Sequence, residues 1–82
     1  MKRLPKLKKI RISSELELNI WLKRNTKHEE SVILVTHTNK AHKHYVSRRQ
    51  VNEILVQYGW EANSRFTLGS NLLGHVVSKL DV

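Results

Sequence analysis

Three of the five histidines in the sequence, His37, His42 and His44, lie within a stretch of eight residues. Imidazole rings bind zinc and copper, so three of them brought together form a candidate metal site. No carboxylate or thiolate accompanies them, and Lys40 and Lys43 add positive charge that opposes a cation. The competing interpretation is a polar loop tip that gains charge at about pH 6 and below. We favour that interpretation, and we expect neither a metal nor another cofactor.

Residue types that catalyse reactions are scarce. The sequence has no cysteine, which excludes disulfides, thiolate metal sites and cysteine nucleophiles. Asp81 is the one aspartate, and the six glutamates fall in expected caps, loops and helix surfaces. Neither the G-x-S-x-G motif of serine hydrolases nor a glycine-rich phosphate loop is present. We therefore expect no enzymatic activity.

Positive charge is the strongest chemical signal in the sequence. The formal net charge is +8, and residues 1–11 contain six basic side chains and no acidic one. These are Lys2, Arg3, Lys6, Lys8, Lys9 and Arg11. Such an arm attracts polyanions through counterion release. The alternatives are a solvated terminus and a membrane-surface segment, and Pro5 together with the lack of a wide apolar face argues against the membrane.

A second basic group runs from the loop tip into the first turn of the next helix. Its members are Lys40, Lys43, Arg48 and Arg49. The free amides of a helix N-terminus suit a phosphate, although a solvated helix face is the alternative. Trp60 follows this helix and, if exposed, can stack on a base, and Arg65 is a further candidate contact.

The first functional hypothesis is therefore a non-enzymatic module that binds nucleic acid, DNA or RNA, largely through its phosphates. Residues 2–11 would provide affinity, and Arg48 and Arg49 would fix the register.

Two helices are predicted where a capping residue precedes an apolar stripe of helical period. Ser14 begins the first helix, which ends at Asn25. Ser47 begins the second, which Gly59 terminates because glycine readily adopts the left-handed conformation.

Strands are predicted from β-branched runs and from alternation. Residues 31–38 form a continuous apolar run, which predicts a central strand covered on both faces, and residues 44–46 are expected to pair with it as a hairpin. Residues 10–12 are a short extended entry at a sheet edge. A turn is expected over residues 61–64 and a third short strand over residues 65–68.

A last helix is predicted for residues 70–80, with Gly74 packed closely against a neighbour. The order is then helix, strand, strand, helix, strand, helix. This predicts a single α+β domain over residues 10–82, with residues 1–9 as a flexible basic arm. No apolar run approaches the roughly 18–20 residues that span a bilayer, and we expect a soluble cytoplasmic protein.

Several short motifs stand in one order: a helix with W-L and then N, a strand with V-I-L-V, and a helix ending in Y-G-W before an R-x-x-L segment. The first motif consists of Trp21, Leu22 and Asn25, and the V-I-L-V strand is residues 32–35. The helix end is Tyr58, Gly59 and Trp60, and the R-x-x-L segment is residues 65–68. Over about residues 14–68 the chain thereby resembles the small bacterial YdeI / OmpD-associated family. The resemblance implies an α+β fold and a link to envelope stress or bacteriocin protection, without catalytic residues.

The second functional hypothesis follows from this resemblance and is a protein-interaction or stress-protection module. It predicts an exposed apolar patch that includes Trp60 and Phe66, and binding that barely changes with salt.

Overall fold

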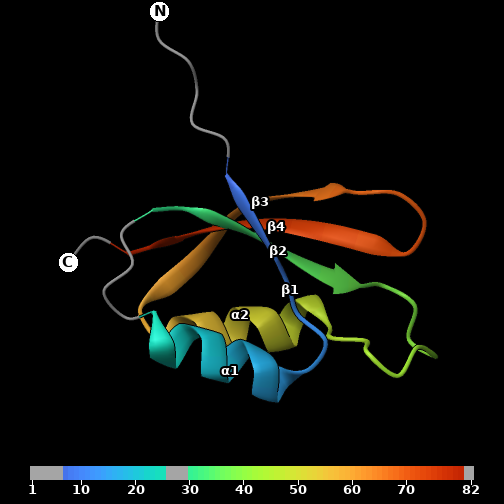
Figure 1. The fold of residues 1–82 in the computed structure, drawn as a ribbon, viewed down its shortest axis with the longest axis horizontal. Helices are drawn as coiled ribbons and strands as arrows, with labels where there is room; N and C mark the ends of the chain where they lie inside the picture. The colour runs from blue at the N-terminus through green and yellow to red at the C-terminus, as the bar shows by residue number, and fades with distance from the viewer. Residues whose placement is uncertain (1–6, 26–29, 81–82) are drawn as a thin grey trace, which may run out of the picture.

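The computed structural model describes residues 7–25 and 30–80 of the chain. Their elements are β1 (Lys8–Arg11), α1 (Glu15–Arg24), β2 (Val32–His37), α2 (Arg48–Gln57), β3 (Trp60–Thr67) and β4 (Leu72–Lys79). The strands form one mixed sheet in the order β1-β2-β4-β3 (Figure 1). Strand β1 is parallel to β2, and β4 is antiparallel to both of its neighbours. The predicted α+β class is confirmed.

Both helices lie on the same side of the sheet (Figure 1). The chain crosses from β1 through α1 to the adjacent parallel strand β2, and then through α2 to β3, two positions farther in the same direction. Such crossovers are nearly always right-handed, so two that run the same way place their helices on one face. Strand β4 then fills the gap between β2 and β3. The other face carries no helix within residues 7–25 and 30–80.

The core lies between the two helices and the sheet. Its central members are Leu18, Leu22, Val51, Ile54 and Leu55 from the helices, and Val32, Leu34, Trp60 and Val77 from the strands. The ring of Trp60 is fully buried and meets that of Trp21 edge to face, with centroids 5.6 Å apart. Aromatic pairs of this kind contribute about 0.5–1.5 kcal/mol beyond their buried area. Trp21 is partly buried and packs against this core.

The predicted helix ends are confirmed. The Ser14 hydroxyl accepts a hydrogen bond from the third amide of α1, and Asn25 caps the other end. At α2, the Ser47 hydroxyl accepts from the Gln50 amide, and the Gln50 side chain accepts in return from the Ser47 amide. Gly59 follows α2 with φ 76°, a conformation that costs other residues free energy. Within the described part of the chain, neither helix is long and apolar enough to cross a membrane.

The predicted last helix is wrong, because residues 72–79 form strand β4. Asn71 and Gly69, both with positive φ, turn the chain back, and β4 pairs with β3 on one side and β2 on the other. In this strand Leu73 and Val77 lie on the helix-covered side of the sheet and Val76 on the other side, so their i, i+3, i+4 spacing matches a helical pattern only by coincidence.

Four further predictions need correction. The antiparallel partner of β2 is β4, not residues 44–46, of which Tyr45 makes only an isolated parallel bridge to His37. Strand β2 is central, but α1 and α2 cover only one of its faces. The expected turn at residues 61–64 belongs to β3, where a bulge falls between Ala62 and Ser64. Strand β1 also takes in Lys8 and Lys9 of the expected arm.

Gly74 is packed closely, as predicted, although in a strand rather than in a helix. A Cβ atom at this position would lie 2.9 Å from Cζ of Phe66 and 3.1 Å from Cδ1 of Leu68. Phe66 is the β3 partner of Gly74, so its ring reaches over β4 and occupies the space that a side chain there would take.

Replacing Gly74 by alanine should therefore destabilise the protein by about 1 kcal/mol, because the ring must move from its place. The double-mutant cycle with Phe66→Ala isolates this contact. In the Phe66→Ala background, Gly74→Ala should be neutral or stabilising, since alanine loses less conformational entropy than glycine in a strand. Equal costs in both backgrounds, measured by urea unfolding, would contradict the packing described.

Candidate functional site

The open face is the side of the sheet that points away from α1 and α2. Because side chains alternate along a strand and paired residues share a face, the strand register identifies its members. From β1 to β3 they are Lys9, Arg11, Ile33, Val35, His37, Leu72, Gly74, Val76, Ser78, Glu61, Ser64 and Phe66. One row across the four strands consists of Arg11, Val35, Gly74 and Phe66. A cation thus stands at one end of the row and an aromatic ring at the other.

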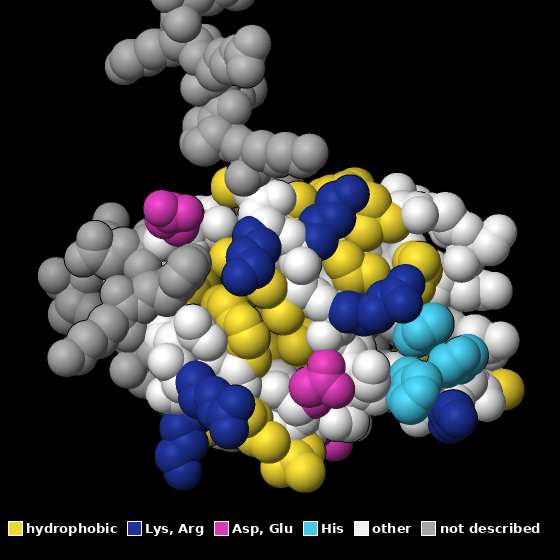
Figure 2. All heavy atoms as spheres, viewed as in Figure 1, with side chains coloured by type: hydrophobic (Ala, Val, Ile, Leu, Met, Phe, Trp, Pro, Cys, Tyr) yellow, Lys and Arg dark blue, Asp and Glu magenta, His cyan; other side chains and the backbone are white. Residues whose placement is uncertain are grey.

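A hollow of about 330 Å³ lies on this face. Its walls are Lys9 and Arg11 from β1, Val35 from β2, Leu68 from the turn after β3, and Leu72 from β4. Figure 2 shows hydrophobic side chains gathered between Lys and Arg side chains, with a group of histidines beside them. The hollow therefore combines an apolar floor with two cations on one rim. Its volume lies within the range of small-ligand sites.

The three clustered histidines are brought together, as the sequence predicted, at the end of β2. The rings of His37 and His42 stack with centroids 3.9 Å apart and planes 9° apart, and His44 lies 5.4 Å from His42. Desolvation, followed by the charges of His42, His44 and Arg11, lowers the pKa of His37. Stacked rings present their faces to one another rather than their nitrogens to a common point. Across residues 7–25 and 30–80, no group of three or more His, Cys, Asp or Glu is arranged to hold a metal ion.

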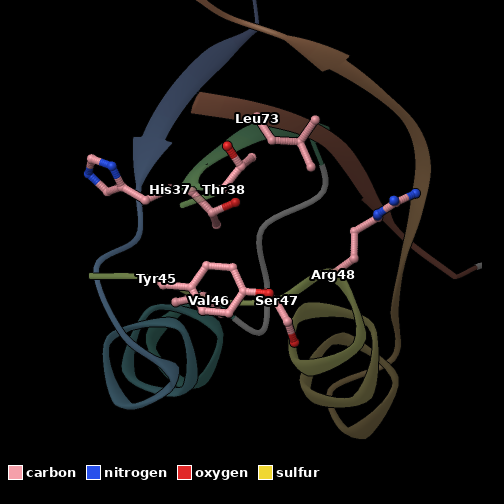
Figure 3. Close-up of a pocket in the computed structure, with 8 residues that line it drawn as sticks. His37, Thr38, Tyr45, Val46, Ser47, Arg48 and Leu73 are labelled. Carbon is pink, nitrogen blue, oxygen red and sulfur yellow. The ribbon is translucent and has the colours of Figure 1, made fainter. Parts of the chain in front are cut away.

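A cavity of about 160 Å³ separates the end of β2 from the start of α2. It is lined by Thr36, His37, Thr38, Tyr45, Val46, Ser47, Arg48 and Leu73. In Figure 3 the imidazole of His37 and the guanidinium of Arg48 point away from the cavity in opposite directions. The Ser47 hydroxyl is engaged in the helix cap. The cations near this helix terminus are therefore not aimed at a common ligand, and the open face is the better candidate site.

His75 occupies the helix-covered side of β4 and is fully buried. Arg65 Nε donates a hydrogen bond to its Nδ1 at 2.9 Å, so the ring is neutral and its Nε2 donates to Thr36 Oγ1 at 2.8 Å. Arg65 also donates to Asn52 Oδ1 on α2. Burial, together with the charges of Arg65 and Arg48, lowers the pKa of His75 to about 4. This relay holds α2, β2, β3 and β4 together through polar groups.

The predicted contact residues fall into several environments. Lys2, Arg3 and Lys6 lie outside the described residues. Lys9 and Arg11 line the hollow, and Lys8 is exposed on the same strand. Lys40 and Lys43 are exposed in the loop over residues 38–46, Arg48 stands beside the cavity, and Arg49 pairs with Glu53 on the outer surface of α2. The basic group over residues 40–49 is therefore divided between a loop, the lining of the cavity and an ion pair on α2.

Two predicted contacts are corrected. Trp60 is fully buried against Trp21, because it begins β3 on the helix-covered side, so it cannot stack on a base or join an exposed patch. Arg65 is half-buried, and its hydrogen bonds to His75 and Asn52 give it a structural role. Phe66, by contrast, is 38% exposed on the open face, where the second hypothesis expected it.

Sequence reasoning missed the His75 relay and the row that joins Arg11 to Phe66. The alternation of Lys9 and Arg11 with the apolar Ile10 and Ile12 was a usable signal, since a strand with one buried side must expose the cations on the other. No such signal existed for His75, whose partners Thr36 and Arg65 come from β2 and β3, and whose link to Asn52 on α2 passes through Arg65.

No protein family model, no curated protein and no solved structure matches this chain. The resemblance to the YdeI / OmpD-associated family therefore stays a prediction.

The buried His75 should make the protein less stable in acid. The unfolded state takes up a proton below pH 6.5, whereas the folded state resists it down to about pH 4, so stability is lost as the pH falls between these values. The pKa difference corresponds to about 3 kcal/mol at most, and screening beside the exposed Arg48 lowers this to about 2. The pKa of His37 is also lowered in the folded state, so this residue adds to the stability that is lost as the pH falls.

His75→Gln keeps a donor for Thr36 but does not titrate. Urea unfolding of this variant at about pH 7 and pH 5 should therefore show a much smaller pH dependence than the wild type. The same loss of stability in both proteins would show that His75 is not the group responsible.

Proposed function

We propose that this protein is a non-enzymatic nucleic-acid-binding module whose binding surface is the open face and the adjoining basic strand β1. The observation that supports this most is the hollow, where Lys9 and Arg11 stand over an apolar floor formed by Val35, Leu68 and Leu72. Phosphates attract the cations, and the floor gives the bases a surface to contact. The sequence places three further cations, Lys2, Arg3 and Lys6, before this strand, and they would add to its attraction for a polyanion.

Charge distribution favours this assignment over the outer surface of α2. Strand β1 carries Lys8, Lys9 and Arg11 without an acidic residue, whereas Arg49 on α2 is neutralised by Glu53 at 3.0 Å. The exposed Glu61 lies near the start of β3, where it pairs with Ser78, whereas Phe66 lies near the end of this strand. The cationic rim thus has no acidic neighbour on its own strand, and its field is available to a polyanion.

A protein partner on the apolar part of the open face is the competing function. Phe66, Leu68 and Leu72 would then contribute most of the binding free energy, and binding would change little with salt. A cationic rim of Lys9 and Arg11 beside an apolar floor fits a nucleic acid better, because its phosphates use the cations and its bases use the floor.

The double variant Lys9→Gln, Arg11→Gln should bind a short oligonucleotide about tenfold more weakly at low salt. Two lost phosphate contacts should also reduce the slope of log K against log salt by about 1.4 for a single strand. Fluorescence anisotropy between about 50 and 200 mM salt measures both quantities.

The matched control is Lys23→Gln, Arg24→Gln, which removes the same charge from the exposed last turn of α1. It should leave the slope and most of the affinity unchanged. Equal effects of the two double variants would mean that net charge alone attracts the nucleic acid. Wild-type binding of no oligonucleotide at low salt would overturn the proposed function.

A further inference from the structure

We propose that the open face takes a single strand rather than a duplex, and that one base of that strand stacks on Phe66 beside the hollow. The inference rests on the proposed function, because it specifies the form of nucleic acid that the same surface binds. It is carried by the arrangement of Phe66, Gly74, Val35 and Arg11 across the four strands.

Phe66 is a positioned ring and not a freely rotating surface side chain. Its Cζ and Cε2 atoms lie 2.9 and 3.1 Å from the point where a Cβ of Gly74 would be, so the ring leans over β4. Leu68 packs beside it, at 3.1 Å from the same point. The ring nevertheless keeps 38% of its surface exposed. A ring that is held in place and still accessible can accept a stacked base with little loss of conformational entropy.

The cations stand where the backbone of such a strand would run. Phe66 pairs with Gly74, Gly74 with Val35, and Val35 with Arg11, so Phe66 and Arg11 stand at opposite ends of one row that crosses β4 and β2. Val35 forms the floor between them and lines the hollow with Lys9 and Arg11. A single-stranded nucleic acid that lies along β1 places its phosphates by these cations and turns its bases toward the apolar floor. Arginine planes also stack on bases, which adds to the contact.

A duplex does not match this surface. Its bases are already paired and stacked, so the ring of Phe66 and the floor of Val35 and Leu72 would meet only sugars and phosphates. Only the cations of β1 would then contribute to binding. A single strand exposes its bases, and each base that stacks on an aromatic side chain strengthens binding. The apolar part of the open face therefore distinguishes the two forms.

Phe66→Leu tests the inference, because leucine keeps an apolar side chain over Gly74 but has no ring. The probes are labelled single strands of about 12 nucleotides, as RNA and as DNA, and a hairpin duplex of matched length, all measured by fluorescence anisotropy. We expect the variant to bind one or both single strands about tenfold more weakly, with unchanged duplex binding and an unchanged salt slope. Val56→Ala on the outer surface of α2 is the matched control, since Val56 is exposed and distant from the open face.

The outcomes separate this inference from the proposed function. Unchanged single-strand binding by Phe66→Leu, with wild-type thermal stability, would overturn the stacking of a base while the phosphate contacts of β1 stand. Tighter binding of the duplex than of both single strands by the wild type would overturn it as well. Failure of the wild type to bind any probe at low salt would overturn both the inference and the proposed function.

Discussion

Two crossover connections run in the same direction across the sheet, and their common handedness places α1 and α2 on one face. The sheet therefore has one side buried in the core and one side without a helix. Strand β1 shows the consequence most simply, since its apolar Ile10 packs against the core while Lys9 and Arg11 stand on the open face. A helix on each face would have required apolar residues at both positions. The candidate site thus follows from the topology.

The open face is shaped by a second constraint, which is the lack of a side chain at position 74. Any Cβ there would collide with Phe66, so glycine allows the ring to lean over the sheet. Glycine is unfavourable in a central strand, because it loses more conformational entropy on folding than other residues and has no side chain to pack. Its place in β4 is explained by the close approach of Phe66. The fold and the proposed function meet at this pair of residues.

Local signals allowed a good prediction of α1 and α2. Ser14, Ser47 and Gly59 act through hydrogen bonds and dihedral angles within a few residues, so their effect can be read from the sequence. The sheet could not be predicted in the same way. Strand β4 pairs with β2, which is about forty residues away, and that pairing outweighs a helical pattern in its own segment. The burial of Trp60 could not be predicted either, because the side of β3 that the helices cover depends on the pairing of β3 with β4. The positive charge of β1 could be predicted from the sequence. The row across the sheet that joins Arg11 to Phe66 could not.

The central claim is that the open face, and not the helices, contacts nucleic acid. The most direct test is an NMR titration of isotope-labelled protein with a single strand of about 12 nucleotides at low salt. The account predicts that chemical-shift changes concentrate on Lys9, Arg11, Val35, Phe66 and Leu72. Changes confined to the exposed helical residues Leu16, Ile20 and Val56, or no changes at all, would contradict it.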